Sequence, residues 1–279
     1  MTEVSLVHVH PVSSSGSPAA WSRTASVTET PSAILEVKSA EKHFGGVVAL
    51  SDGNFELRPN EVHAIVGDNG AGKSTLLKLI AGALQPDGGE ILIDGVRVTI
   101  ANPKAARVFG IATVFQDLAL IDHLDAGSNM FLGRELLRRP PLSWLGVLDK
   151  PAMRARAIEE VHRLKVDIRS VDQLVLGMSG GQRQAVAVAR AVAFGNRIIV
   201  MDEPTAALGV RESRAVIDLI KEIQGQGLSV IMISHSLPEV FEVADRITVL
   251  RLGKTVQTTT RQQTSLTDIV GMMTGAYGR

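Results

Sequence analysis

The stretch from residue 61 to residue 84 limits the folds open to this chain of 279 residues more than any other part of it. The run EVHAIVG predicts a buried strand, and KSTLLKLIAGAL predicts a helix soon after it. Between them, residues 67–74 read GDNGAGKS and match the pattern G-x-x-x-x-G-K-[ST]. A glycine-rich loop between a strand and a helix predicts a phosphate-binding turn at the edge of an α/β sheet.

The residue types in this loop match the needs of a nucleotide's phosphates. Glycines let the backbone curl so that successive N–H groups point at one phosphate, and the helix N-terminus adds about half a positive charge. We expect Lys73 to bridge the β- and γ-phosphates and the Ser74 hydroxyl to reach Mg²⁺. The predicted nucleotide-binding residues of this loop are Gly67, Asp68, Asn69, Gly70, Ala71, Gly72, Lys73, Ser74 and Thr75.

A second apolar run, RIIVM, ends in two carboxylates, Asp202 and Glu203. Behind a phosphate loop, Asp202 is expected to hold Mg²⁺, directly or through water, and Glu203 to act as general base on an attacking water. Acidic pairs that follow a buried strand are more commonly solvated loop residues. The catalytic interpretation therefore depends on the phosphate loop upstream.

Residues 178–182, MSGGQ, precede the helical run RQAVAVARAVAFG. Ser179 can cap this helix while the N–H groups after it stay free, which makes a second anion site at a helix N-terminus. Two phosphate sites far apart in one chain indicate a nucleotide held between two chains, and an ordinary Ser-Gly helix start is the competing interpretation. The residues predicted to bind nucleotide from the opposite chain are Ser179, Gly180, Gly181 and Gln182.

The rest of the chain predicts one α/β domain with a helical insertion. After residue 190, strand-like runs such as RIIVM and LSVIMIS alternate with helical runs, which indicates a parallel sheet covered on both faces. Residues 117–190 have few strand signals and carry helical patterns. We therefore expect a domain over residues 33–279 with a helical insertion at about 117–190. Residues 1–32, rich in Ser, Thr and Pro, are expected to form a disordered extension.

Composition excludes several functional classes. The chain has no cysteine, so disulfides, thiol catalysis and cysteine-based metal sites are absent. Lys and Arg together number 29, as do Asp and Glu, and this zero net charge argues against a nucleic-acid partner. No apolar run reaches the length of about eighteen residues that a membrane span requires. The sequence predicts a soluble or peripheral chain.

The phosphate loop, MSGGQ and the acidic strand end, in this order, resemble the ATP-binding subunit of an ABC transporter over residues 34–279. The resemblance implies a P-loop NTPase core with a mostly parallel sheet, an N-terminal antiparallel β subdomain and an inserted helical subdomain. It implies ATP and Mg²⁺ as ligands, and a second ATPase subunit that completes a homodimer. It also implies transmembrane permease subunits as partners and a peripheral position on the cytoplasmic face of the cell membrane.

Three further residues acquire roles only through this resemblance. Phe44 stands where the family carries an aromatic residue, usually Tyr, that stacks on adenine. Gln116 matches the Q-loop glutamine, which reaches Mg²⁺ and the attacking water, and His235 matches the switch histidine that contacts the γ-phosphate. The catalytic residues implied are Glu203, His235 and Gln116, and the implied metal ligands are Ser74, Gln116 and Asp202.

The segment PTAALG at residues 204–209 occupies the D-loop of that family, which more commonly ends in Asp. Gly209 cannot make the carboxylate contact that Asp would make to the opposite subunit. This substitution, together with GDNGAGKST and MDEPTAALGVRES, resembles ATPases that import monosaccharides of the ribose, xylose and fructose type. A single cassette of this kind needs a second copy, and the resemblance implies an extracytoplasmic sugar-binding protein as an indirect partner.

Two alternatives stay open at this point. One is the ATPase subunit of an exporter or of a non-sugar transporter, and the other is a non-transport ATPase of the same superfamily that acts on DNA. The short spacing between the phosphate loop and MSGGQ, without sustained heptads, argues against the second.

The predicted insertion contains LLRRPPLSWLGVLDK at residues 136–150. Arg138, Arg139 and Trp144 in this segment suit a contact with the permease. A surface loop with Trp144 packed on its own helices is the competing interpretation.

Overall fold

The computed structural model describes residues 32–194 and 196–276. The predicted disordered extension therefore lies, apart from Ser32, outside the described residues. The strands are β1 (Leu35–Phe44), β2 (Val47–Leu57), β3 (Val62–Val66), β4 (Gly88–Ile93), β5 (Val96–Val98), β6 (Ile111–Val114), β7 (Ile198–Asp202), β8 (Ser229–Ile233), β9 (Arg246–Arg251) and β10 (Lys254–Thr260). The helices are α1 (Lys73–Ile80), α2 (Pro103–Val108), α3 (Ala126–Phe131), α4 (Lys150–Arg163), α5 (Gly180–Val192), α6 (Val210–Gly225), α7 (Leu237–Val243) and α8 (Leu266–Thr274), with short 3-10 turns η1 (Leu142–Leu145), η2 (Val175–Gly177) and η3 (Arg261–Gln263).

Within the described residues, the strands form one sheet in the order β5-β4-β1-β2-β10-β9-β3-β8-β7-β6. Strands β9, β3, β8, β7 and β6 pair in parallel. Strands β5, β4, β1 and β2 pair antiparallel. Strand β10 joins the two parts, because it is antiparallel to β9 and meets β2 in parallel at Lys254 and Asp52. The predicted fold class, a mostly parallel α/β core with an antiparallel N-terminal part, is confirmed.

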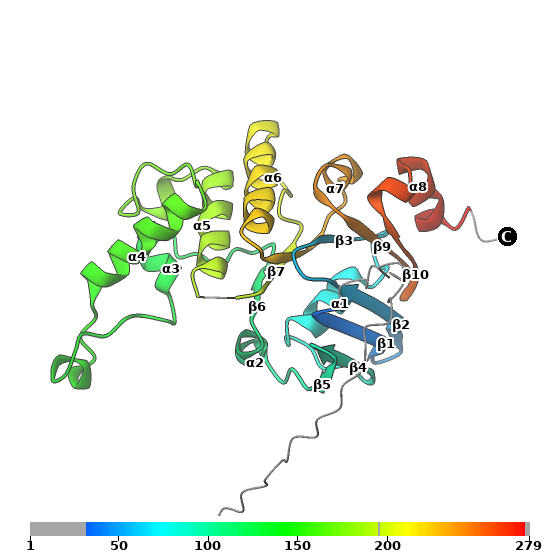
Figure 1. The fold of residues 1–279 in the computed structure, drawn as a ribbon, viewed down its shortest axis with the longest axis horizontal. Coiled ribbons are helices and arrows are strands. Elements are labelled where there is room, and N and C mark those ends of the chain that lie inside the picture. The colour runs from blue at the N-terminus through cyan, green and yellow to red at the C-terminus, as the bar shows by residue number, and fades with distance from the viewer. Residues whose placement is uncertain (1–31, 195, 277–279) are drawn as a thin grey trace, which may run out of the picture. The chain divides into compact units, whose positions relative to one another are not determined.

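Two apolar cores lie on opposite faces of the parallel strands. Strands β3 and β8 are buried along their whole length, as parallel strands covered on both faces must be. Ala64 of β3 belongs to the core shared with α6, and its neighbour Ile65 belongs to the core shared with α1. Successive strand residues point to opposite faces, so one strand serves both cores. Figure 1 shows α1 on one side of these strands and α6 and α7 on the other.

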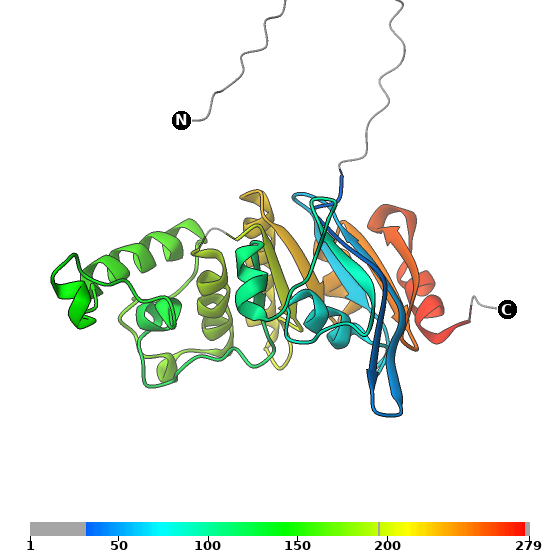
Figure 2. The same ribbon diagram turned by 90° about the horizontal axis from the view of Figure 1, so that it is seen from below.

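The elements between residues 117 and 190 are all helical, namely α3, η1, α4, η2 and α5. Figures 1 and 2 show α3, α4 and α5 grouped beyond the β6 edge of the sheet. The buried Asn129 of α3 holds the start of this stretch, because its amide donates to the carbonyls of Ile121 and Asp125, each at 3.0 Å. The boundaries of the predicted insertion, 117 and 190, stay a prediction.

Trp144 lies on the surface of this helical stretch. Its side chain is 81% exposed, in the turn η1 between α3 and α4. The interpretation in which Trp144 packs on its own helices is therefore wrong.

Two helices form where the sequence analysis predicted none. Asn102 caps α2 by accepting a hydrogen bond from the Ala105 backbone N–H at 2.9 Å, and Ser265 caps α8 through the Asp268 N–H at 3.2 Å. Both caps satisfy N–H groups that a helix start leaves free. In the part of the chain that the structure describes, no helix is both long and apolar enough to cross a bilayer.

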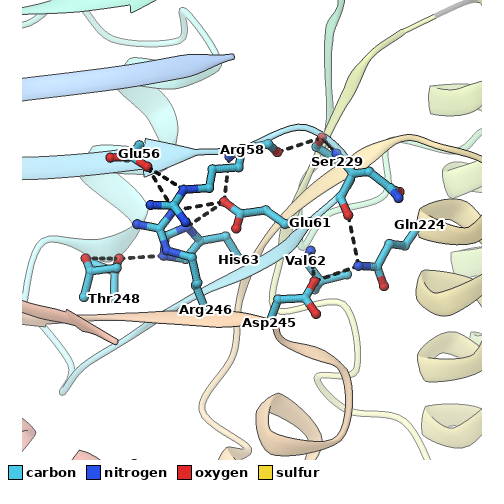
Figure 3. A network of polar contacts seen from close by, with 12 residues as sticks. Glu56, Arg58, Glu61, Val62, His63, Gln224, Ser229, Asp245, Arg246 and Thr248 are labelled. Carbon is cyan, nitrogen blue, oxygen red and sulfur yellow. Dashed lines mark hydrogen bonds and ion pairs between the residues drawn. The ribbon is translucent and has the colours of Figure 1, made fainter. Parts of the chain in front are cut away.

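A polar network closes the amino ends of β3 and β9 (Figure 3). The buried imidazole of His63 places Nε2 2.7 Å from the Thr248 hydroxyl. The Arg246 guanidinium lies 3.2 Å from a Glu56 carboxylate oxygen and 3.4 Å from one of Glu61. Burial lowers the pKa of His63, because the charged imidazolium loses its hydration there. The network anchors the end of β3 opposite to the phosphate loop.

Candidate active site

Three parallel strands have their carboxyl ends at the same end of the sheet. The register pairs Ile65 of β3 with Ile233 of β8, and Ile233 in turn with Asp202 of β7. The loops that follow these strands therefore begin side by side, as in other open α/β sheets. The phosphate loop follows β3, Glu203 follows β7, and His235 follows β8. Residues from three distant parts of the sequence meet at one edge.

Gln116 follows β6, the strand next to β7 in the sheet, at the same carboxyl end. Val114 of β6 pairs with Met201 of β7, so Gln116 and Glu203 each stand two residues beyond a paired position. The Gln116 side chain is exposed. The structure thus places the predicted Q-loop glutamine beside the strand that carries the acidic pair.

The phosphate loop depends on glycine at two close approaches. Gly67 has φ +154°, and a Cβ there would lie 2.2 Å from the Leu250 carbonyl oxygen. Gly72 has φ +103°, and a Cβ there would lie 2.8 Å from the Ala49 carbonyl oxygen. Only glycine can hold this curl against β9 on one side and β2 on the other. The tip of the loop, residues 68–70, stays exposed.

Lys73 fills the inside of the loop with positive charge. Its Nζ donates to the carbonyl oxygens of Gly67, at 2.7 Å, and of Asp68, at 2.9 Å. Burial lowers the pKa of Lys73, while the carboxylates of Glu203 and Asp202 act in the opposite direction. Two weak carbonyl partners hold an ammonium that a phosphate oxygen would bind more strongly.

Asp202 lies where a cation would relieve repulsion. Burial, followed by the negative charge of Glu203, raises the pKa of Asp202. Among the described residues no group of three or more His, Cys, Asp and Glu side chains is arranged to hold a metal ion. A metal here would need donors in addition to the Asp202 carboxylate, and phosphate oxygens and water are ordinary partners of Mg²⁺.

Glu203 and His235 form a pair across the ends of β7 and β8. His235 Nε2 lies 2.7 Å from Glu203 Oε1. Glu203 has φ +50°, a left-handed conformation that non-glycine residues rarely adopt, and its N–H donates to the Ile233 carbonyl oxygen at 3.0 Å. Backbone strain of this kind costs about 1–3 kcal/mol and concentrates at functional sites. The residue that carries this strain is the one whose carboxylate contacts His235.

Phe44 is the last residue of β1, next to the turn of the β1–β2 hairpin. Its ring is 46% exposed, and the Lys42 ammonium lies 5.8 Å from the ring centroid. Strand β2 of this hairpin runs past Gly72 of the phosphate loop, with Leu50 against it. An exposed aromatic ring on an element that touches the loop is suited to stack on a base.

Residues 179–182, which the sequence analysis predicts to bind nucleotide from the opposite chain, lie at the start of α5. They are called the signature residues below. Ser179 accepts a hydrogen bond from the Gln182 N–H at 3.3 Å, and its own N–H donates to the Gln182 side chain at 3.1 Å. Ser179 and Gln182 line a cleft of about 470 Å³ against α6. A second cleft, of about 640 Å³, is lined by Glu203 and His235, and residues of α6 line both clefts. Figures 1 and 2 show α5 apart from α1 along the horizontal axis of both views.

The sequence profile of the ABC transporter family matches residues 50–206. This chain is an ATP-binding cassette of the ABC transporter family. The matched residues include the phosphate loop, the signature helix and the acidic strand end. The resemblance on which the sequence analysis relied is thereby confirmed.

The chain is similar in sequence to several sugar import ATP-binding proteins. A fructose import ATP-binding protein of Rhizobium meliloti is 47% identical over 246 residues, 87% of the cassette and 94% of that protein. A xylose/arabinose import ATP-binding protein of Sulfolobus acidocaldarius is 42% identical, over 86% of the cassette and 94% of that protein. A putative ribose/galactose/methyl galactoside import ATP-binding protein of Burkholderia ambifaria is 43% identical, but the cassette spans only 47% of its length.

Solved structures share the fold. The ADP conformation of an ABC transporter cassette is 25% identical with a TM-score of 0.74, over 87% of this chain and 95% of that chain. A dimeric bacterial ABC transporter cassette is 27% identical with a TM-score of 0.67, over 81% of this chain and 98% of that chain.

The D-loop of the cassette is held by contacts that the sequence analysis did not anticipate. The Thr205 hydroxyl donates to Glu239 of α7 at 2.6 Å. The Gly209 N–H donates to the Glu212 carboxylate at 3.0 Å, so Glu212 closes the start of α6 where the family more commonly has Asp at 209. The partner of Thr205 belongs to the helix after His235, and no local pattern signals that contact.

Arg190 is a second residue that the sequence analysis missed. Its guanidinium donates to the Leu118 carbonyl at 2.6 Å and to the Ala119 carbonyl at 2.8 Å. Arg190 lies near the end of α5, and the two carbonyls belong to the loop after Gln116. The side chain therefore ties the signature helix to the Q-loop.

Replacing Arg190 with Ala is expected to lower ATP turnover about tenfold or more with little change in nucleotide affinity. Charge-assisted hydrogen bonds contribute about 1.5–3 kcal/mol, and their loss frees the loop that carries Gln116. Steady-state kcat and KM measure the effect. Arg156→Ala removes a similar bond, to the Ala193 carbonyl at 2.8 Å away from this loop, and serves as the control. Equal losses in both variants would assign Arg190 a general structural role.

Proposed function

We propose that this cassette hydrolyses ATP to power the import of a monosaccharide through a membrane permease. The observation that carries the ATPase assignment is the shared strand edge, where the phosphate loop, Asp202, Glu203 and His235 stand at the ends of β3, β7 and β8. Phosphoryl transfer needs these parts in this arrangement: a cradle for phosphates, an acidic ligand for the metal, and a base for water.

In the proposed reaction, a water molecule attacks the γ-phosphorus of ATP, and the bond from that phosphorus to the oxygen bridging to ADP breaks. Glu203 accepts a proton of the water, and His235, hydrogen-bonded to Glu203, contacts the γ-phosphate. Lys73 exchanges its loop carbonyls for β- and γ-phosphate oxygens. Phe44 stacks on adenine. Gln116 orients the water.

Mg²⁺ fits this site. The donors available are the Ser74 hydroxyl, the Gln116 amide and the Asp202 carboxylate, all of them the hard oxygen ligands that Mg²⁺ prefers. Burial and the neighbouring Glu203 raise the pKa of Asp202, and a cation would relieve both effects. When bound, the ion supplies charge neutralisation for the phosphates. Ser74, Gln116 and Asp202 would hold it.

The proposed assembly contains two copies of the cassette on the cytoplasmic face of the membrane, bound to permease subunits and served by an extracytoplasmic sugar-binding protein. Ser179, Gly180, Gly181 and Gln182 of one copy complete the nucleotide site of the other. The phosphate loop leads into α1 and the signature residues lead into α5, and the distance between these two helices in Figures 1 and 2 supports this sharing. So does the dimeric form of a solved cassette with a TM-score of 0.67.

The sugar assignment is supported by relatives that are named for the import of fructose and of xylose or arabinose and that match the cassette over nearly their whole length. It is tested in the organism that encodes the chain, by replacing Glu203 with Gln and measuring uptake of labelled fructose, ribose and xylose. Uptake of one monosaccharide is expected to fall, with maltose uptake unchanged. Normal uptake of all three sugars would favour another transported substrate or export.

Lys73→Ala is expected to weaken ATP affinity at least about tenfold, because charge-assisted contacts to phosphate contribute about 1.5–3 kcal/mol each. Titration with a fluorescent ATP analogue measures the change. Lys104→Ala, at an exposed position of α2, is the matched control and should stay near wild type. Near-normal ATP affinity and turnover in the Lys73 variant would show that the phosphate loop is wrongly assigned.

A further inference from the structure

Residues 137–148, between α3 and α4, present an unusual concentration of exposed apolar side chains. Trp144 is 81% exposed and Leu145 is 78% exposed. The other large apolar side chains exposed in this segment are Leu137, Leu142, Val147 and Leu148. Several large apolar side chains exposed on one short segment indicate a candidate interaction site.

The segment has a defined conformation of its own. The Arg138 N–H donates to the Val147 carbonyl at 2.9 Å, and the Asp149 N–H donates to the Leu136 carbonyl at 2.7 Å. These bonds close the base of a narrow loop whose end is the turn η1. Figures 1 and 2 show this green segment projecting away from α3 and α4. The exposed apolar side chains therefore lie on a loop with a defined conformation. Residues 137–148 are called the projection below.

The charge of the projection is positive. Arg138 and Arg139 are exposed, and neither forms an ion pair within residues 32–194 and 196–276. The acidic residues at either end are already engaged: Glu135 accepts the Gly133 N–H at 2.9 Å, and Asp149 caps α4 through the Ala152 N–H at 3.1 Å. Residues 137–148 themselves contain no acidic side chain.

We infer that residues 137–148 insert into the headgroup layer of a membrane that contains anionic phospholipids. Indole and leucine side chains partition into the interface between headgroups and acyl chains, while arginines keep their charge at the phosphate level. A protein interface needs about one hydrogen bond per 100–200 Å². Apart from its two arginines, the segment offers only the Ser143 hydroxyl and the Trp144 indole N–H as polar side-chain groups, and an indole N–H can also hydrogen-bond at the headgroup level of a bilayer. The composition therefore favours lipid over a protein partner.

This inference relies on the proposed function only for the presence of a membrane near the cassette. Vesicle binding requires no nucleotide hydrolysis, so the two can fail separately. A chain that binds vesicles without hydrolysing ATP would refute the proposed function alone. A chain that hydrolyses ATP without touching lipid would refute the insertion alone.

The test uses the tryptophan inside the projection as the reporter. The chain has two tryptophans, Trp144 and Trp21, and Trp21 lies outside the described residues. In the full chain with Trp21→Phe, vesicles of phosphatidylcholine mixed with phosphatidylglycerol are expected to shift Trp144 emission to the blue. Brominated acyl chains in those vesicles should quench it. Pure phosphatidylcholine vesicles and high salt should weaken both effects.

Two double variants separate the charged from the apolar contribution. Arg138→Gln with Arg139→Gln is expected to weaken binding to anionic vesicles about 25-fold, at about fivefold per arginine. Trp144→Ser with Leu145→Ser, in the chain that keeps Trp21, should weaken vesicle co-sedimentation at least about tenfold. The matched controls lie elsewhere on the surface: Lys104→Gln with Arg169→Gln for charge, and Val96→Ser with Val108→Ser for apolar exposure.

Three results would overturn the inference: Trp144 emission that vesicles leave unchanged, equal losses in the variants and their controls, or vesicle binding that survives both double variants. If the variants lose affinity for detergent-solubilised permease while their vesicle binding is unchanged, the projection contacts protein instead of lipid.

Discussion

Glu203→Gln is expected to slow ATP hydrolysis at least about a hundredfold while ATP still binds. The amide has the shape of the carboxylate and can accept the hydrogen bond from His235, now at 2.7 Å, but it cannot accept a proton from water. ATP should then stay in the site, and the ATP-bound dimer should accumulate. Phosphate release, affinity for a fluorescent ATP analogue, and the dimer fraction in size-exclusion chromatography measure these three effects.

Glu242→Gln is the matched control for this variant. Glu242 lines the same cleft as Glu203, yet its carboxylate pairs with Lys221 at 2.7 Å and also with Arg214. Its hydrolysis rate should stay within about a factor of two of wild type, because exposed ion pairs contribute little. Native turnover in Glu203→Gln would exclude Glu203 as the base, and His235→Ala would become the next variant to measure.

A mixture of two inactive variants is expected to recover nucleotide binding if each site is shared between two chains. Lys73→Ala removes the phosphate contact in one subunit, and Ser179→Arg places a bulky charge at the signature of the other. Each homodimer should therefore lose both sites. In a mixed dimer one site carries both defects and the opposite site carries neither. One intact site returns.

The readout for this mixture is trapping of nucleotide, because coupled sites can both be required for turnover. Adding Glu203→Gln to both chains slows loss of the bound nucleotide, which stabilises the closed dimer. Trapping near half a nucleotide per chain in mixed dimers is the expected result. Ser179→Arg also removes a helix cap that contributes about 1 kcal/mol to stability. Labelled subunits are therefore needed to verify that this variant still folds and assembles with the other. Co-assembly without recovered trapping would mean that phosphate loop and signature serve the same nucleotide within one chain.

Local patterns were sufficient for three central strands of the parallel sheet and for the conformation of the glycine-rich loop. Runs such as EVHAIVG, RIIVM and LSVIMIS correspond to β3, β7 and β8, because burial on both faces of a parallel sheet demands continuous apolar sequence. The turn of the glycine-rich loop could also be predicted from its glycines, because the steric limits that require them act within a few residues. The helices α2 and α8 were not anticipated. Short helices depend on caps and packing more than on propensity.

The roles of Phe44, Gln116 and His235 came from the family resemblance, since a lone aromatic, amide or imidazole has no distinctive local pattern. Those roles stay predictions. The structure adds where the three residues stand: on a hairpin that touches the phosphate loop, beside the acidic strand, and in contact with Glu203.

The sequence by itself determined which segments form the central strands, where the glycine-rich loop leads into a helix, and which carboxylates follow a buried strand. Only the tertiary structure decided which of these groups meet. Glu203 contacts His235 because β7 and β8 are neighbours in the sheet, and the order of strands in a sheet is not written in any short segment. Arg190 reaches the Leu118 carbonyl across 72 positions of sequence, and Trp144 faces outward because its loop closes on itself. Contacts of this range depend on the pairing and packing of the whole chain, whereas sterics and periodicity act over a few residues.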